Sequence, residues 1–231
     1  MQPIDAVILD VGGVLLVPHY EPVNSALGPS GIALDAGAAE RAHFVGIRSL
    51  DAASDDEREA RHAYLRGYAE AAGVPSEQRE GAVSQMRKIW GGPTIDLWRQ
   101  QVRGSVEGLR CLRDRGLRLG IVSNADGTIE EQLRRERICQ VGEGLGVPVL
   151  AIVDSHLVGV EKPSAEIFQH ALEPLGVSPE RAVYVGDTVR YDVRGARAAG
   201  LRPVHFDPYE LCPERGDHVH VARLRDLSGL L

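Results

Sequence analysis

The chain has 231 residues, of which 43% are hydrophobic and 26% are charged, and its formal net charge is −7 at pH 7. This composition is typical of a globular protein rather than a disordered one, and the length suffices for one large domain or for a core with an insertion. The negative charge and the lack of a Lys/Arg block argue against a nucleic-acid partner, and we find no apolar run long enough for a membrane span or a signal peptide. The three cysteines, Cys111, Cys139 and Cys212, form no C-x-x-C pair, so the sequence indicates neither a disulfide framework nor a zinc site and predicts a soluble, cytoplasmic protein.

The first predicted element is a buried strand at residues 6–9, which ends at Asp10 and breaks into Gly12 and Gly13. Four more apolar runs predict strands at residues 117–122, 149–153, 182–185 and 203–206. Helical patterns lie between them, at residues 106–115, 129–137, 165–175 and 193–199. Strands that are apolar throughout are buried on both faces, so the pattern predicts an α/β fold, a doubly wound Rossmann-like parallel sheet that binds ligands at the carboxyl ends of its strands.

Residues 17–98 interrupt this alternation, since they contain no clear buried strand and have helical patterns instead. Ser54 and Glu57 predict a capping box at the start of one helix. Three residues of that helix recur at helical spacing and are interpreted as packing surface: Ala60, Tyr64 and Tyr68. A second helix is predicted at residues 76–90.

These patterns predict two domains. We expect an all-α domain at residues 17–98, inserted into an α/β core that is formed by residues 1–16 and 99–231.

Acidic residues follow two of the predicted strands. Asp10 ends the first strand, while Asp187 and Asp192 follow the strand at residues 182–185. Carboxylates brought together at one sheet edge would repel one another by about 4 kcal/mol per pair at roughly 4 Å and an effective dielectric constant of about 20. Such a cluster needs a cation, and Mg²⁺ is suited to it because it prefers carboxylate, water and phosphate oxygens.

Other residues near the predicted strand ends have the chemistry to bind a phosphate. Ser123 can donate to a phosphoryl oxygen, and the amides after it lead into a helix N-terminus, which favours an anion. Lys162 supplies a positive charge, and Pro163 restricts the backbone before it. A carboxylate such as that of Asp10 can then act as a nucleophile.

These motifs resemble those of the haloacid dehalogenase (HAD) superfamily of hydrolases, in the subgroup with a helical cap inserted after the first strand. The resemblance covers the core and rests on three motifs: Gly186-Asp187 with Asp192, the run at residues 194–200, and the run at residues 159–168. It implies that Asp10 is the nucleophile of a phospho-aspartyl intermediate.

The resemblance also assigns roles to the other site residues. Ser123 would bind the transferring phosphoryl group, and Lys162 would stabilise its charge and that of Asp10. Gly13 and Asn124 would contact the substrate beside them. Mg²⁺ would be held by Asp10, Asp187 and the carbonyl of Gly12, while Asp192 would lie just behind these ligands or bind the ion through water.

One position departs from the family pattern. Phosphatases of the family usually carry a second aspartate two residues after the nucleophile as an acid/base catalyst, and this chain has Gly12 there. Positioned acid/base catalysis is typically worth about 10²–10⁴-fold in rate. A substitute such as His19 or His43, or a substrate whose leaving group needs little protonation, would make up for the loss.

The sequence thus predicts a Mg²⁺-dependent phosphatase for a small phosphorylated metabolite, acting as a monomer or a homodimer. Two alternatives stay open: a metal-independent dehalogenase, which also lacks the second acid, and a degenerate module that binds a phosphorylated ligand without turnover. Retention of Asp187 favours the phosphatase, because family dehalogenases lose that Gly-Asp pair.

Overall fold

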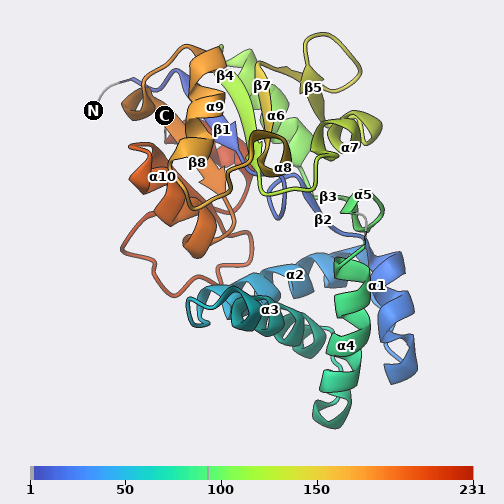
Figure 1. Ribbon diagram of the computed structural model, residues 1–231. Helices are drawn as coiled ribbons and strands as arrows, with labels where there is room; N and C mark the ends of the chain where they lie inside the picture. The colour runs from blue at the N-terminus through green and yellow to red at the C-terminus, as the bar shows by residue number, and fades with distance from the viewer. Residues whose placement is uncertain (1–2, 93, 231) are drawn as a thin grey trace. The chain divides into compact units, whose positions relative to one another are not determined.

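The computed structural model describes residues 3–92 and 94–230 (Figure 1). It divides into two compact units. The first comprises the described residues up to Leu15 and from Gln101 onward, and the second comprises Leu16–Gln100.

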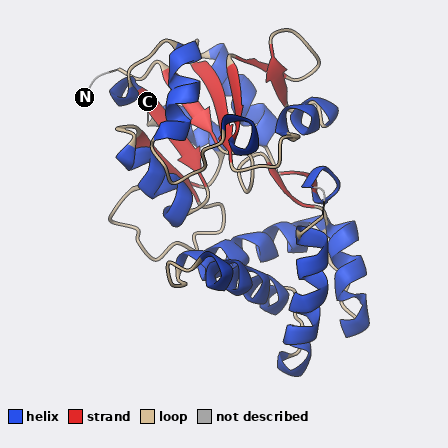
Figure 2. Cartoon of the chain, in the orientation of Figure 1, coloured by secondary structure: helices blue, strands red, loops and turns tan. Residues whose placement is uncertain are grey.

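The centre of the first unit is a parallel sheet of six strands in the order β10-β9-β8-β1-β4-β7 (Figure 2). Its strands, in chain order, are β1 (Ala6–Leu9), β4 (Arg118–Ser123), β7 (Ala151–Asp154), β8 (Ala182–Gly186), β9 (Arg202–Phe206) and β10 (Val219–Val221). Two short parallel strands form a separate pair: β5 (Cys139–Val141) and β6 (Val147–Val149). The predicted α/β fold class with a Rossmann-like parallel sheet is confirmed.

Helical segments connect these strands. They are α6 (Ser105–Asp114), α7 (Ile129–Arg135), α8 (Ser155–Val158), α9 (Glu166–Leu175), η3 (Pro179–Arg181), the π-helical turn η4 (Val189–Val193), α10 (Arg194–Ala198) and η5 (Leu224–Gly229). Glycines with positive φ angles end several of them, as at Gly176 after α9, where the φ angle is 61°.

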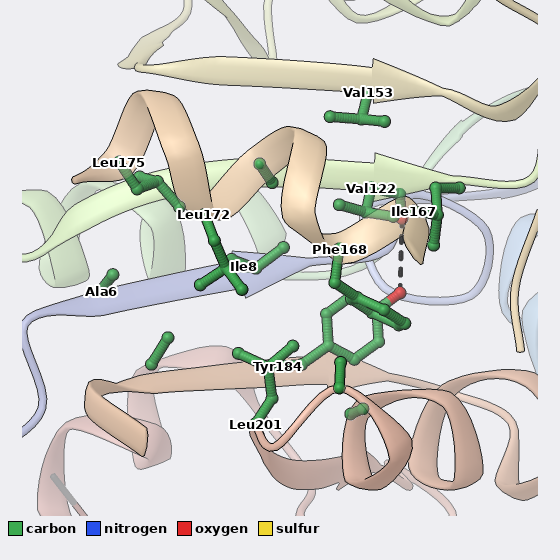
Figure 3. Packing of buried hydrophobic residues seen from close by; sticks show 14 residues of the cluster. Ala6, Ile8, Val122, Val153, Ile167, Phe168, Leu172, Leu175, Tyr184 and Leu201 are labelled. Atoms are coloured by element: carbon green, nitrogen blue, oxygen red, sulfur yellow. Dashed lines mark hydrogen bonds between the residues drawn. The ribbon is translucent and has the colours of Figure 1, made fainter. Parts of the chain in front are cut away.

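Apolar residues from both sides of the strands fill the core. On one face, Ile8, Val122 and Tyr184 pack against Phe168 of α9, whose ring meets the Tyr184 ring edge to face at 4.9 Å between centroids (Figure 3). Residues at alternate strand positions, such as Val183, are also fully buried. Burial on both faces explains why these strands are apolar without alternation.

The structure corrects two predicted elements of this unit. The strand predicted at residues 149–153 is divided between β6 and β7, because Leu150 leaves both sheets, donates from its amide to the carbonyl of Leu119 at 2.8 Å and is half exposed. The helix predicted at residues 193–199 is α10 preceded by η4, since the Thr188 hydroxyl accepts from the amides of Tyr191 and Asp192 and starts the helix earlier.

The second unit is mainly helical. Its helical segments are α1 (Tyr20–Leu27), η1 (Gly28–Ser30), α2 (Ala36–Asp51), α3 (Glu57–Ala71), η2 (Ser76–Gln78), α4 (Arg79–Trp90) and α5 (Thr94–Leu97). It also begins with the buried strand β2 (Leu16–Pro18), which pairs with β3 (Trp98–Gln101). The prediction that residues 17–98 contain no buried strand was therefore wrong at the start of that range.

Two local predictions about α3 have different outcomes. The N-cap is Asp56, whose carboxylate accepts from the Glu59 amide at 2.8 Å, so the predicted capping box of Ser54 and Glu57 is wrong. Tyr64 and Tyr68 are buried and pack with Trp90 of α4 at 6.0 and 5.7 Å between ring centroids, which confirms them as packing surface.

No helix in the described part of the chain is long and apolar enough to cross a membrane.

The two tyrosines of α3 differ in their polar contacts, which generates a stability test. The Tyr64 hydroxyl lies 2.9 Å from Nδ1 of His43, whereas the buried Tyr68 hydroxyl has no hydrogen-bond partner among the described residues. We expect Tyr68→Phe to raise the free energy of unfolding by about 1 kcal/mol and the matched Tyr64→Phe to lower it by about 1 kcal/mol. Urea unfolding followed by far-UV circular dichroism measures both, and a destabilised Tyr68→Phe variant would contradict the prediction.

Candidate active site

The candidate site begins at the carboxyl edge of three neighbouring strands. β1 lies between β4 and β8, and all three run in parallel. Asp10 directly follows β1, Ser123 is the last residue of β4, and Asp187 follows Gly186 at the end of β8. Parallel pairing therefore brings residues that are distant in the sequence to the same edge.

The structure brings together the three acids that the sequence singled out. Carboxylate oxygens of Asp10, Asp187 and Asp192 all lie within 4.8 Å of one another, and each residue is at most 8% exposed. Buried carboxylates at this spacing offer hard oxygen donors for a small divalent cation such as Mg²⁺. The donor set therefore fits the metal that the sequence predicted.

Lys162 is the cation that the described structure places among these acids. Its Nζ atom lies 2.9 Å from Oδ2 of Asp10 and 2.7 Å from Oδ1 of Asp192, and its side chain is 2% exposed. It also donates to the Tyr184 hydroxyl at 2.9 Å. Lys162 supplies one positive charge beside the three acids, and a divalent cation bound there would add two more.

Asn124 fixes the main chain on which Lys162 is carried. Its side-chain amide donates to the Lys162 carbonyl at 3.0 Å, and its side-chain oxygen accepts from the Lys162 amide at 2.8 Å. The peptide bond from Lys162 to Pro163 is cis. The side-chain amide of Asn124 thus positions Lys162, and the contact of Asn124 with substrate stays a prediction.

Asp192 is held by two residues that no sequence motif indicated. Its Oδ2 atom accepts from the Thr188 hydroxyl at 2.6 Å and from the Thr188 amide at 3.0 Å, and the Tyr184 hydroxyl lies 2.9 Å from its Oδ1. Tyr184 also contacts the carbonyl of Val122 at 3.3 Å (Figure 3). Tyr184 is a residue with a polar hydroxyl within an otherwise apolar buried strand, which is the signal that could have identified it. Its ring belongs to the core, and its hydroxyl reaches the site.

Two glycines permit the close approach of the acids. A Cβ atom on Gly13 would lie 1.9 Å from Oδ2 of Asp187, and the φ angle of Gly13 is 69°. A Cβ atom on Gly186 would lie 2.2 Å from the carboxyl carbon of Asp192. The predicted substrate contact Gly13 thus packs directly against an acid of the cluster.

Burial and mutual repulsion change the acidity of the cluster. Desolvation, opposed by Lys162 and supported by Asp192 and Asp187, raises the pKa of Asp10 to about 7. Desolvation would lower the pKa of Lys162, but the charges of Asp10 and Asp192 raise it, so the amine stays protonated. Desolvation likewise opposes ionisation of Asp192, yet Lys162 and the Thr188 hydrogen bonds hold its pKa below the ordinary value.

The loop after Ser123 has less anion-binding capacity than the sequence predicted. Ser123 is buried, but the amides of Gly127 and Ile129 at the start of α7 donate to Oδ2 of Asp154, at 2.9 and 3.3 Å. The Ala125 amide donates to the Ser155 hydroxyl at 3.1 Å. An acidic cap therefore already occupies the helix terminus that was expected to favour a phosphate.

The structure gives local roles to the two histidines considered as substitutes for the acid/base missing at Gly12. His43 is fully buried within the second unit, where it contacts Tyr64. His19 is the N-cap of α1, and its Nδ1 accepts from the Glu21 amide at 3.3 Å. His43 is therefore part of the packing of α2, and His19 caps the start of α1.

The contact between Gly13 and Asp187 yields a prediction with a matched control. We expect Gly13→Ala to destabilise the protein by more than the 1–2 kcal/mol or so that a left-handed alanine costs, because its methyl group must displace the Asp187 carboxylate. Gly116→Ala has a comparable φ angle of 80° with no atom within 4 Å of the place its methyl group would take, and should show only the backbone cost. Chemical unfolding of the two variants measures the difference, and equal losses would contradict the steric argument.

Comparisons with known proteins agree with this geometry. The family of haloacid dehalogenase-like hydrolases matches residues 4–200. Among curated relatives, a phosphoserine phosphatase from Thermus thermophilus is 39% identical over 119 residues, which cover 50% of this chain and 45% of the relative. A glyceraldehyde 3-phosphate phosphatase from Methanopyrus kandleri is 41% identical over 98 residues, covering 42% of this chain and 40% of the relative. The matched part of the chain thus spans about half the length of these relatives or less.

Solved structures share the fold. A HAD phosphatase from Thermococcus onnurineus superposes with a TM-score of 0.58 at 20% identity, covering 98% of this chain and 97% of that one. A 2-haloacid dehalogenase from Pseudomonas syringae superposes with a TM-score of 0.55 at 21% identity, covering 98% of this chain and 97% of that one. Fold similarity alone therefore does not separate the two chemistries. The family match over most of the sequence does establish that the chain belongs to the haloacid dehalogenase-like hydrolases.

Proposed function

We propose that the protein is a Mg²⁺-dependent phosphatase that hydrolyses a small phosphorylated metabolite through a phospho-aspartyl intermediate on Asp10. The observation that carries the proposal is the cluster of Asp10, Asp187 and Asp192 around Lys162, with carboxylate oxygens within 4.8 Å of one another. The named phosphatases among the curated relatives support the same substrate class.

The metal would be held by the carboxylates of Asp10 and Asp187 and by the Gly12 carbonyl, with Asp192 bound directly or through water. When bound, Mg²⁺ neutralises charge on the transferring phosphoryl group and on Asp10. Asp192 already bonds to Lys162 and Thr188, so its main task in this proposal is to position Lys162.

Asp10 is the nucleophile in this proposal. Its Oδ1 accepts from the Val11 amide at 2.7 Å and its Oδ2 contacts Lys162, so the carboxylate is held in one orientation. One oxygen attacks phosphorus, the bond from phosphorus to the leaving oxygen breaks, and water then hydrolyses the acyl phosphate. Lys162 and Ser123 stabilise the charge on the phosphoryl oxygens.

A metal-independent dehalogenase is the alternative enzymatic function. It would use the same nucleophile, and a haloacid dehalogenase shares the fold. It has no need of a third buried acid, however, and Asp187 adds repulsion that raises the pKa of Asp10. Retaining an acid that disfavours the ionised nucleophile makes sense where a cation offsets it, which favours the phosphatase. A binding module without turnover is consistent with Gly12, but it gives no reason for a fixed nucleophile.

Turnover of a generic aryl phosphate with Mg²⁺ tests the proposed function. We expect release of inorganic phosphate that stops with chelator and falls by roughly 10⁴-fold or more in Asp10→Asn. Asp5→Asn, a matched change just before the opposite end of β1, should leave the rate unchanged. Halide release from 2-haloacids without metal would support the dehalogenase instead. If neither reaction occurs but phosphorylated metabolites raise the melting temperature, the binding module is correct; a screen of such metabolites then identifies the ligand.

The raised pKa of Asp10 predicts an unusual pH dependence of stability without metal. The folded protein keeps the Asp10 proton up to pH about 7, whereas the carboxyl ordinarily releases it near 3.8. Because the folded state binds more protons in this window, the contribution of Asp10 lowers the free energy of unfolding as the pH rises through it. In chelator at about pH 8, Asp10→Asn should therefore melt above the wild type, and the difference should shrink towards about pH 5.

Mg²⁺ should reverse the order of the two melting temperatures at about pH 8. It should stabilise the wild type, in which it binds ionised Asp10, more than it stabilises Asp10→Asn. Thermal unfolding across the pH range, with and without Mg²⁺, measures both effects. A variant that melts below the wild type in chelator at the higher pH would show that ionised Asp10 is favoured by Lys162 more than burial disfavours it.

A further inference from the structure

A second group of side chains that could hold a metal ion lies on the side of β8 away from β1, around the strands β9 and β10. His205 lies on β9 and His220 on β10, and the two are paired in register between these parallel strands. His218 precedes β10, and Cys212 lies in the connection between the strands. One ligand atom from each of the four lies within 4.8 Å of the others.

The distances within this His/Cys cluster are close to those of a tetrahedral zinc site. Nδ1 of His205 lies 3.0 Å from Nε2 of His218, and Sγ of Cys212 lies 3.8 Å from the same atom. Tetrahedral Zn²⁺ with Zn–N of about 2.05 Å and Zn–S of about 2.3 Å separates two nitrogens by about 3.3 Å and a nitrogen from a sulfur by about 3.6 Å. Shifts of a few tenths of an ångström at these atoms would meet that geometry.

Hydrogen bonds outside the cluster direct lone pairs into it. Nε2 of His205 must donate, because its partner at 2.8 Å is the carbonyl oxygen of Asp187, and Nδ1 then carries the lone pair. Nδ1 of His218 faces the Asp217 carboxylate at 3.3 Å, which favours a proton there and a lone pair on Nε2. Two lone pairs 3.0 Å apart repel each other unless a proton or a metal ion lies between them. Metal-bound histidines typically have such outer partners.

The remaining two residues complete a donor set. Both ring nitrogens of His220 are buried, and no side chain of the described residues forms a hydrogen bond with either of them. The main chain of Glu214 is a polar group that interacts with the ring. The Asp207 carboxylate lies 3.6 Å from its Nδ1. Cys212 is buried and is not in a disulfide. His205 and Cys212 are buried, and His218 and His220 are partly buried. Three imidazoles and one thiol are ligand types that Zn²⁺ prefers.

We propose that His205, Cys212, His218 and His220 bind one Zn²⁺ ion as a structural site. Four protein ligands fill the tetrahedral coordination and leave no open position for a substrate. Binding converts the Cys212 thiol to a thiolate and releases its proton to solvent, while the imidazoles bind as neutral rings. The ion would tie β9, β10 and the connection between them together.

This proposal does not depend on the phosphatase assignment. All four residues lie beyond residue 200, where the match to the hydrolase family ends. The cysteine spacing in the sequence indicated no zinc site, because the ligands are a single cysteine and three histidines. Parallel strand pairing brings His205 beside His220, and the connection between the two strands supplies Cys212 and His218.

Binding of Co²⁺ to tag-free, metal-stripped protein, with Mg²⁺ in excess to occupy the acid cluster, tests the site. We expect one equivalent of Co²⁺ to give a thiolate-to-metal charge-transfer band and the intense visible bands of tetrahedral coordination. One equivalent of Zn²⁺ should displace the Co²⁺ and remove all of these bands. Zn²⁺ should also raise the melting temperature.

Variants identify the ligands. Cys212→Ser should abolish the charge-transfer band, and His220→Ala should weaken Co²⁺ binding at least tenfold, with circular dichroism reporting that each variant is folded. The control Cys111→Ser, a change on α6, and Asp10→Asn should keep the full spectrum. The proposal is overturned if the wild type shows no charge-transfer band, or if the band survives in Cys212→Ser. If Cys212→Ser does not fold, an unchanged Co²⁺ affinity in His220→Ala overturns it instead.

Discussion

The site depends on one electrostatic constraint, the burial of three carboxylates around a single ammonium group. Lys162 lies within 3 Å of oxygens from both Asp10 and Asp192, and Asp187 adds a third acid to the cluster. Removing such charges from water is costly unless they are balanced. Desolvation by burial is the main cause of the raised pKa of Asp10, and repulsion from Asp192 and Asp187 adds to it. A bound divalent cation would offset the negative charge of the acids and favour the ionised form of Asp10, in which it could act as the proposed nucleophile.

The fold supports this arrangement by attaching the polar cluster to the hydrophobic core. Tyr184 shows how: its ring packs against Phe168 inside the core (Figure 3). Its hydroxyl contacts Lys162 and Asp192. Gly13 and Gly186 leave the space that the acids occupy. The positions of the charges are thus set by packed neighbours rather than by the charges themselves, which would otherwise move apart.

The features that could be predicted from the sequence are those that depend on the strand pattern and on the residue type at each strand end. Apolar runs ending in Asp10 or in Gly186-Asp187 locate both the sheet and the acids, because parallel strands have their carboxyl ends at one edge. The contacts of Asn124 and Asp154 were not predictable in this way. Asp154 is the last residue of β7 and Asn124 directly follows β4, and both have short polar side chains. Whether such a side chain meets a substrate or caps a neighbouring segment depends on the path of another loop. Asn124 turned out to bond to Lys162, which is 38 residues away along the chain.

Asp187 connects the two candidate metal sites through different atoms. Its carboxylate belongs to the acid cluster, while its main-chain carbonyl accepts a hydrogen bond from His205 of the His/Cys cluster. The two donor sets differ in kind: carboxylate oxygens suit Mg²⁺, whereas imidazole and thiolate favour Zn²⁺. An ion held by His205 would also fix the Asp187 main chain, and with it the direction in which its carboxylate meets the nucleophile.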